Sequence, residues 1–392
     1  MANFIIFLIL ICATAVNAAP AISTISDDTP ANDQSVTLTG TGFTSHGLDI
    51  EWLGGSSGNI ESGTNGVAFS KTSWAADSTN AATQAPLYST TRAHSGTKSI
   101  MSSFPLESQY DSGFEYQYGS DFDEIYAVWY VYFDRGGSPM GGQWKQFRLR
   151  PTSGYNNADG EVMVSGRHFY TGLPNYELVM MFCDVDSYGQ CYEDGTGSQR
   201  WVDDYYVDQW FMVEFYAKAS SVANTADGQV IINFYDQTGT VAEIFSYDEL
   251  ITRISESDAW NRLTFQNYWG NRDEGGDGTS EKIYMDDVYV QIGDRAHIMI
   301  GDNATYTSCT HLEIQHPTAW STTSITFDIN QGSFASDSTG YVFVIDSSGV
   351  ASTGKQVTFG EGGSSAAASI ARTETGLSMV KSGTGCSFTK GE

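Results

Sequence analysis

The sequence predicts an all-β protein in which one β-sandwich is inserted into a smaller β-sandwich. From about residue 60 to 293, alternating runs rich in aromatic and β-branched residues are separated by clusters of Gly, Asn, Asp and Ser. Long amphipathic helical stretches are absent from this region. The two ends of the chain supply strand-like segments with too few apolar residues to hold a core alone, so we expect them to pair with each other.

Residues 1–18 have the pattern of a secretory signal peptide. Residues 4–12 form a short apolar run, and Val16-Asn-Ala18 has the small residues of a cleavage site. The run is too short for a membrane-spanning helix, and no other stretch is long enough. We therefore expect an exported chain, secreted or held at the cell surface, with no membrane span.

The segment after the signal predicts two short strands, because Val36 and Leu38 alternate with Thr37 and Thr39. Further strands are expected near the other end of the chain, at 323–330, 340–346 and 355–359.

The opening, with Pro20, spaced isoleucines and then V-T-L-T-G-T-G-F, resembles the immunoglobulin-like IPT/TIG family. The resemblance covers residues 20–47 and 295–360. It implies a discontinuous immunoglobulin-like domain that hosts residues 48–294, followed by a flexible tail at 361–392.

Three strands of the middle region show an apolar face beside a face of aromatic and charged residues. The apolar faces consist of Ala127, Trp129, Val131, Phe133, Phe147, Leu149, Phe211, Val213, Phe215 and Ala217. The opposite faces carry the candidate ligand-binding residues Tyr130, Tyr132, Gln146, Arg148, Arg150, Trp210, Glu214 and Tyr216.

Several strings of the middle region resemble the concanavalin A-like jelly roll of secreted lectins, polysaccharide lyases and laminarinase-like hydrolases. The strings are His94 to Ser99, Ala127 to Asp134, Lys145 to Arg150, Asp208 to Trp210 with Glu214 and Tyr216, Asp227 to Asp236, and Lys282 to Val290. The resemblance implies a jelly-roll β-sandwich whose concave sheet binds glycan chains by aromatic stacking and polar contacts. It does not indicate which sheet is concave.

Catalytic residues are harder to identify. The paired carboxylates of a retaining hydrolase, spaced Glu-x-Asp-x-x-Glu, do not occur. A lyase would need a group to neutralise a uronate carboxylate and a base to remove the adjacent proton. Gln146, Arg148 and Arg150 fit the first role, with Arg148 as the main candidate, and Tyr216, His168 or Lys218 fit the second. Carbohydrate binding is the first expectation; β-elimination from a uronate polymer and a structural role at the cell surface are the alternatives.

The chain is strongly acidic, with 47 Asp and Glu against 19 Lys and Arg, a net charge of −28. Such a field repels nucleic acids and anionic membranes and excludes both as partners. The jelly-roll resemblance also implies one structural calcium ion, held by Asp286 or Asp287 of the last strand with Asn59 or Glu61 from the start of the domain.

Four cysteines remain after removal of the signal, and four cysteines allow three pairings. Cys183 and Cys191 flank a turn-rich loop and are expected to form one disulfide. Cys309 and Cys386 would then form the other and tie the tail to the small domain.

Overall fold

The computed structural model describes residues 18–55, 60–71, 74–76, 85–104, 112–134, 142–151, 161–168, 177–183, 191–192, 201–203, 208–236, 241–253, 259–270, 281–360, 377–382 and 385–390. Most of the predicted signal peptide and part of the predicted tail lie outside these residues. Regular structure in the described part is all-β, as predicted, apart from the 3₁₀ turn η1 (Tyr306–Ser308). No helix in the described part is long and apolar enough to cross a membrane.

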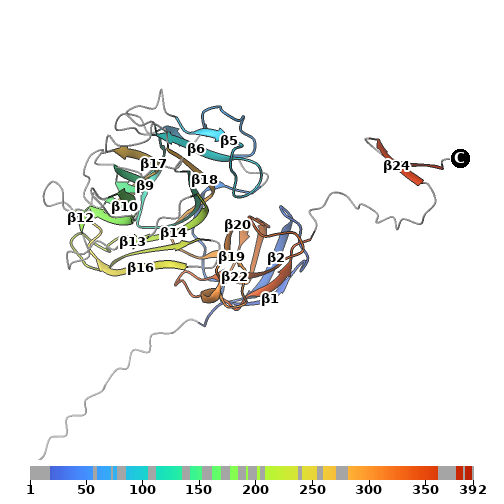
Figure 1. Ribbon diagram of the computed structural model, residues 1–392. Helices are drawn as coiled ribbons and strands as arrows, with labels where there is room; N and C mark the ends of the chain where they lie inside the picture. The colour runs from blue at the N-terminus through green and yellow to red at the C-terminus, as the bar shows by residue number, and fades with distance from the viewer. Residues whose placement is uncertain are drawn as a thin grey trace, which may run out of the picture.

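The middle of the chain forms a jelly-roll β-sandwich of two antiparallel sheets, the large sandwich (Figure 1). Sheet 1 contains, in spatial order, β16 (Val241–Leu250), β15 (Gly228–Tyr235), β14 (Trp210–Lys218), β8 (Glu124–Asp134), β18 (Glu281–Ile292), β6 (Ser99–Phe104) and β5 (Leu87–Ser89), and β3 (Leu48–Leu53) also pairs with β18. Sheet 2 contains β12 (Cys191–Tyr192), β11 (Glu177–Cys183), β10 (Glu161–His168), β9 (Gly142–Pro151), β17 (Trp260–Gly270), β7 (Phe114–Phe122) and β4 (Trp74–Ala76), and β13 (Trp201–Asp203) also pairs with β11.

Every second residue of the strands points inward and forms the core between sheets 1 and 2. The ring centroids of Trp129 and Phe147 are 5.1 Å apart, and those of Phe147 and Phe215 are 4.8 Å apart. These contacts join β8 and β14 of sheet 1 to β9 of sheet 2. The predicted inward-facing residues all belong to this core: Ala127, Trp129, Val131, Phe133, Phe147, Leu149, Phe211, Val213, Phe215 and Ala217. The prediction of their faces is therefore confirmed.

The two ends of the chain pair with each other in a second set of strands, the small sandwich. Its strands are, in spatial order, β1 (Ala21–Ile25), β2 (Ser35–Thr41), β21 (Ser324–Asp328), β20 (Leu312–Trp320), β19 (His297–Gly301), β22 (Thr339–Ile345) and β23 (Lys355–Thr358). Val36 and Leu38 share one apolar cluster with Ile325 and Phe327, so segments almost three hundred residues apart bury each other. Membership of the IPT/TIG family and the domain boundaries stay predictions.

Strand β20 belongs to both faces of the small sandwich. Residues 312–315 pair with β19, and residues 316–320 pair with β21, with an irregular register between Pro317 and Ala319. Proline has no amide hydrogen to donate, so it is tolerated where a ladder is interrupted. The change of partner lets the first half of β20 lie against the large sandwich.

The cysteine predictions have different outcomes. Cys183 and Cys191 are paired directly across β11 and β12, but their side chains lie outside the described part, and this disulfide stays a prediction. Cys309 is a buried free thiol whose Sγ lies 3.4 Å from the carbonyl oxygen of Asn303. The predicted bridge from Cys309 to Cys386 is therefore not formed. Cys386 belongs to a separate hairpin of β24 (Leu377–Ser382) and β25 (Gly385–Lys390), which pair only with each other among the described strands.

Candidate functional site

The structure divides the predicted ligand-binding face between two sheets. Tyr130 and Tyr132 of β8 pair in register with Met212 and Trp210 of β14 in sheet 1. Gln146, Arg148 and Arg150 lie instead on β9, in sheet 2. The prediction of one continuous face is wrong, because alternation assigns residues to the two sides of a strand but does not tell which sheet the strand joins.

The sheet 1 part of the predicted face is covered by the small sandwich. Tyr130 is fully buried, donates a hydrogen bond to the carbonyl of Leu312 at 2.8 Å and accepts one from the amide of Ile314 at 3.2 Å. Met212 packs in the same apolar cluster as Leu312, Ile314 and Phe343. These side chains hold the two sandwiches together and are not available to a polymer.

Glu214 is also part of this interface. Its carboxylate accepts hydrogen bonds from Tyr126 at 2.8 Å and from Asn233 at 2.7 Å. Nε2 of His297, from β19, lies 3.7 Å from Glu214 Oε1, and the His297 ring stacks on Tyr126 at 4.1 Å between centroids. Burial lowers the pKa of His297 to about 4, only partly opposed by the Glu214 charge, so this histidine is neutral at pH 7.

The bases considered for a lyase are not assembled around Arg148. Tyr216 lies on sheet 1, donates a hydrogen bond to Glu124 at 2.6 Å, and burial raises its pKa well above the ordinary value. Lys218 is exposed at the end of the same strand. His168 ends β10, on sheet 2, and its side chain lies outside the described part. Tyr216 and Lys218 thus lie in the other sheet from Arg148, and their prediction as its catalytic partners is wrong.

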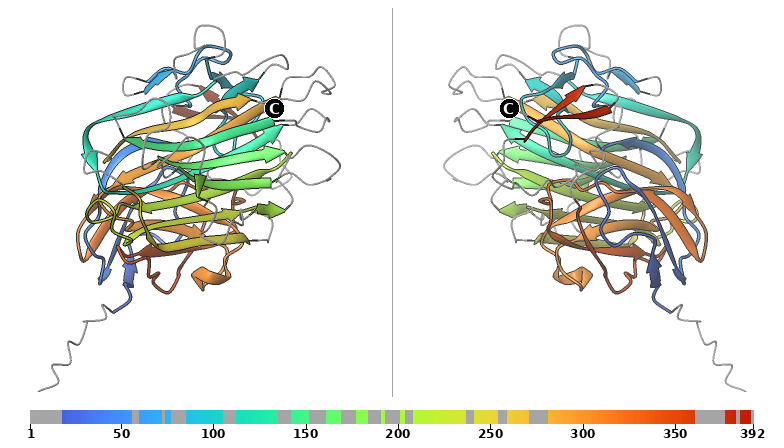
Figure 2. Two further views of the ribbon diagram at one scale, coloured as in Figure 1. Left: turned by 90° about the vertical axis from the view of Figure 1, so that its left-hand side faces the viewer. Right: turned by 90° about the vertical axis from the view of Figure 1, so that its right-hand side faces the viewer.

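The sheet 2 part of the predicted face keeps its residues together around an irregularity in the sheet. Phe147 is paired with Val164 of β10, and Lys145 with Ser165, so Gln146 has no partner in that ladder. The ladder with β17 is irregular at the same point. Bulges of this kind re-aim side chains and are frequent beside functional sites. Figure 2 shows, in its left view, the strands of sheet 2 side by side on the face turned away from the small sandwich.

Gln146 is completely buried, and neither its Oε1 nor its Nε2 has a hydrogen-bond partner among the described residues. Alternation along β9 places Gln146 on the same side as Arg148, while Phe147 points into the core. Arg148 is partly exposed. Arg148 is therefore accessible from solvent, whereas the side chain of Gln146 is covered.

A charged cluster continues from β9 across the next two strands. Arg150 Nη2 lies 3.2 Å from Glu115 Oε2 on β7 and also donates to the Thr264 hydroxyl on β17. Arg262 Nε lies 3.4 Å from the other oxygen of Glu115. Arg150 and Arg262 are directly paired in register, so one carboxylate serves two guanidinium groups. The sequence prediction missed Glu115, Arg262 and Thr264, whose only signal was alternation within their own strands.

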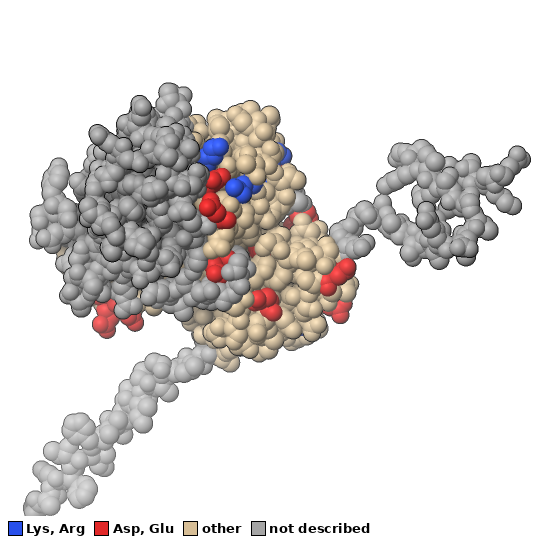
Figure 3. Space-filling model, viewed as in Figure 1, with Lys and Arg blue, Asp and Glu red and all other residues tan. Residues whose placement is uncertain are grey.

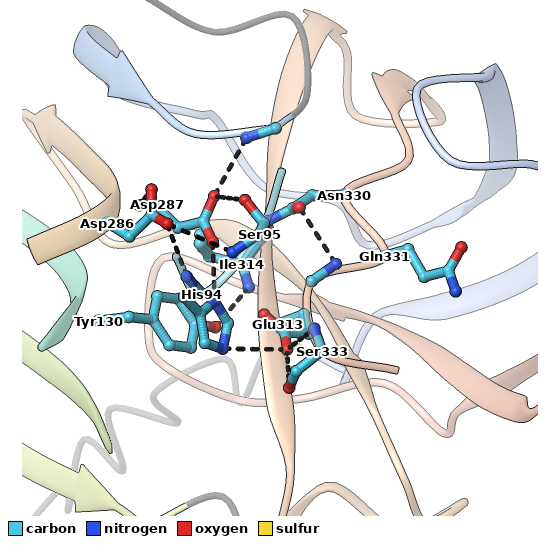
Figure 4. A network of polar contacts seen from close by, with 12 residues as sticks. His94, Ser95, Tyr130, Asp286, Asp287, Glu313, Ile314, Asn330, Gln331 and Ser333 are labelled. Atoms are coloured by element: carbon cyan, nitrogen blue, oxygen red, sulfur yellow. Dashed lines mark hydrogen bonds and ion pairs between the residues drawn. The ribbon is translucent and has the colours of Figure 1, made fainter. Parts of the chain in front are cut away.

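The predicted metal ligands lie at a second irregularity, in β18. Between Asp286 and Tyr289 the register with β8 shifts, and Asp287 has a φ of 46°, which residues other than glycine rarely adopt. The two carboxylates turn toward the loop before β6: Asp286 accepts from the amide of His94 at 2.8 Å, and Asp287 lies 2.8 Å from His94 Nδ1. Figure 4 shows this network.

Glu61 holds the same loop from another direction. It accepts hydrogen bonds from the amide of Thr97 at 2.9 Å and the amide of Lys98 at 2.8 Å. The side chains that the structure brings close enough to share a metal ion are instead those of His94, Asp287 and Glu313. Glu61 is not among them. A calcium ion bound by Asp286 or Asp287 with Glu61 stays a prediction, and the alternative ligand Asn59 lies outside the described residues.

The described acidic residues do not form one continuous patch on the face shown in Figure 3. On the face shown in Figure 3, the described Asp and Glu side chains form separate small groups over both sandwiches. The cationic cluster of sheet 2 therefore contrasts with the acidic character of the chain as a whole.

No family model matches the chain, and no curated protein matches its sequence. Among solved structures, it is similar to an alginate lyase from Aplysia kurodai, with 15% identity over 53% of this chain and 87% of that chain and a TM-score of 0.39. An alginate lyase from a Chlorella virus is 11% identical over 53% of this chain and 89% of that chain, with a TM-score of 0.34. Lectin II from Ulex europaeus is 9% identical over 58% of this chain and 99% of that chain, with a TM-score of 0.33. These TM-scores are too low to support an argument, and the fold rests on the strand pairing described above.

Proposed function

We propose that the chain is a secreted protein that binds a carboxylate-bearing polysaccharide along the outer face of sheet 2. The observation that carries the proposal is the partly exposed Arg148 beside the buried Gln146 amide, which has no partner among the described residues, on a strand that also carries Arg150. A buried polar group without a hydrogen bond costs about 1–3 kcal/mol, so native structures contain few of them. A sugar hydroxyl can donate to the amide oxygen and a sugar carboxylate can accept from the amide nitrogen, so the two together could satisfy both atoms.

The charge of this face favours an acidic sugar. Arg148, Arg150 and Arg262 lie on two adjacent strands, with Glu115 as the acidic group placed among them. Guanidinium groups bind carboxylates through two parallel hydrogen bonds, which gives such contacts geometric specificity. The net charge of −28 would repel a polyanion at long range, but salt screens charges beyond about 8 Å at physiological ionic strength. The local cationic cluster therefore dominates at contact distance.

The same arginines support a second function, β-elimination from a uronate polymer, because they could neutralise the carboxylate next to the proton that is removed. Tyr216 and Lys218 lie on the other sheet, so a base would have to come from elsewhere on sheet 2. Binding without chemistry needs no such group and is the function that we favour.

Three variants test the proposal by titration with polygalacturonate, polymannuronate and a neutral glucan. Gln146→Met removes the amide at similar volume, and Arg148→Gln removes a partly exposed charge. Arg92→Gln is the matched control, since Arg92 stacks on Tyr132 near the end of β8 in sheet 1, 4.0 Å from the ring centroid. We expect both sheet 2 variants to weaken binding of an acidic polymer at least tenfold, about 1.4 kcal/mol, and the control to bind like the wild type.

The same samples separate the alternatives. If ultraviolet absorbance from an unsaturated product grows with the wild type but not with Arg148→Gln, the protein is a lyase, and the proposal of binding without chemistry is wrong. Binding that is equal in the wild type and both sheet 2 variants would place the ligand elsewhere. If no polymer is retained, a structural role becomes the better explanation.

A further inference from the structure

A second polar cluster lies between the two sandwiches, far along the chain from the sheet 2 face. His94 comes from the loop before β6, Asp287 from the bulge of β18, and Glu313 from β20 of the small sandwich (Figure 4). All three side chains are at most 1% exposed. One nitrogen or oxygen of each lies within 4.8 Å of the others.

Two atoms of this cluster lack hydrogen-bond partners. His94 Nδ1 is engaged by Asp287 at 2.8 Å, but its Nε2 has no hydrogen bond. Glu313 Oε1 receives the amide of Ser333 at 2.9 Å, whereas Oε2 has no partner. Buried groups of this kind are normally paired or coordinate a metal. An imidazole with one unpaired nitrogen, 3.5 Å from a carboxylate that keeps one of its oxygens unpaired, points to a cation bound beside both groups.

We propose that His94 and Glu313 bind a divalent cation of the zinc type at the junction of the two sandwiches, with Asp287 orienting the histidine. His94 Nε2 and Glu313 Oε1 are 3.5 Å apart. Two ligands of a tetrahedral zinc, at about 2.0–2.1 Å from the metal, are separated by about 3.3 Å. The pair therefore already has almost the spacing that zinc requires.

The surroundings fit this role. A carboxylate that accepts a hydrogen bond from the distal ring nitrogen, as Asp287 does, fixes the tautomer and orientation of a metal-binding histidine. The ring of His94 is also held by stacking on Tyr130, at 3.9 Å between centroids. His311, just before β20, places its Nε2 2.7 Å from Glu313 Oε1 and holds this carboxylate in position.

The donor set separates zinc from calcium. Calcium takes six to eight oxygen ligands, while zinc binds imidazole and carboxylate in four-coordinate sites. Because His94 and Glu313 come from different sandwiches, a bound cation would also stabilise their docking. This site is independent of the polysaccharide face, which lies on the other sheet of the large sandwich.

The test measures metal bound to the purified full chain after treatment with chelator, addition of ZnCl₂ or CaCl₂, and gel filtration. We expect retention of about one zinc and no calcium per chain, and loss of this zinc in His94→Gln. His316→Gln is the matched control, because His316 lies at the same junction, 3.8 Å from Asp49, outside the cluster. Zinc at 100 times its dissociation constant should raise the Tm of the wild type by about 3 °C and leave that of His94→Gln unchanged.

Zinc retained equally by the wild type and His94→Gln, or by neither, would overturn the proposal, as would retention of calcium instead. If His94→Gln does not fold, Co²⁺ added to the wild type decides. An intense visible spectrum typical of tetrahedral Co²⁺ supports the site, and the weak spectrum of the aqueous ion refutes it.

Discussion

The stability of the junction between the sandwiches should fall as the pH falls, because His297 is buried in its neutral form. Its imidazole stacks on Tyr126, faces Glu214 at 3.7 Å and donates a hydrogen bond from Nδ1 to the carbonyl oxygen of Arg295 at 2.6 Å. Burial lowers its pKa from the ordinary value of 6.5 to about 4. The unfolded chain therefore binds a proton at higher pH than the folded chain does, and the folded state loses stability between these two values.

The magnitude follows from the two pKa values. One pKa unit corresponds to 1.36 kcal/mol, so the full shift is worth roughly 3 kcal/mol, and about 2.5 kcal/mol of it is lost on going from pH 7.5 to pH 4.5. His316, whose pKa is also lowered by burial, acts in the same direction. His94 acts in the opposite direction: burial lowers its pKa, but the charges of Glu313 and Asp287 raise it more, so its contribution is present at low pH and lost as the pH rises.

The assay is urea unfolding of the wild type and His297→Phe at pH 7.5 and pH 4.5. Phenylalanine keeps a ring against Tyr126 and does not titrate. The substitution itself changes the free energy of unfolding by the same amount at both pH values. This change cancels when the value of each protein at pH 4.5 is subtracted from its own value at pH 7.5. We expect the wild type to lose about 2.5 kcal/mol more than the variant on acidification. Equal losses would refute the assignment of a buried neutral histidine.

Three further predictions concern packing, ion pairing and thiol reactivity. Phe343→Ala, in the apolar cluster of the junction, should lower the free energy of unfolding by about 3–5 kcal/mol, measured by urea unfolding. Arg150→Met leaves Glu115 with one guanidinium fewer in a partly buried position and should destabilise the chain by about 1–3 kcal/mol, whereas Arg148→Gln should change stability by less than about 0.5 kcal/mol; equal effects would contradict the burial of Arg150. Burial raises the pKa of Cys309 to about 11, so at pH 8 iodoacetamide should label Cys309 far more slowly in the folded chain than in urea, as followed by peptide mass spectrometry.

The sequence was sufficient to predict the strands and their inner faces, because alternation is a local signal. Trp129 and Phe147 each lie in a strand whose neighbours reveal the side that is apolar. Whether the other face of a strand is buried depends on contacts with residues far away in the sequence, and alternation does not predict these contacts. Tyr130 donates to the carbonyl of Leu312, 182 residues away, and a tyrosine that seemed available to a sugar is buried by the small sandwich.

The candidate site shows the same limit. Gln146, Arg148 and Arg150 were identified from one strand, and the structure keeps them together on sheet 2. Glu115 and Arg262 join them only through the pairing of β7, β17 and β9, which sequence spacing does not give.

The central claim, that sheet 2 binds the carboxylates of an acidic polysaccharide, is tested most directly by isothermal titration of the wild type with polygalacturonate and with the same polymer after reduction of its carboxyl groups. Both polymers present the same sugar backbone, and only one carries charge. The account predicts at least tenfold tighter binding of the charged polymer, with a difference that shrinks as salt is added. Equal affinity for the two polymers would contradict it.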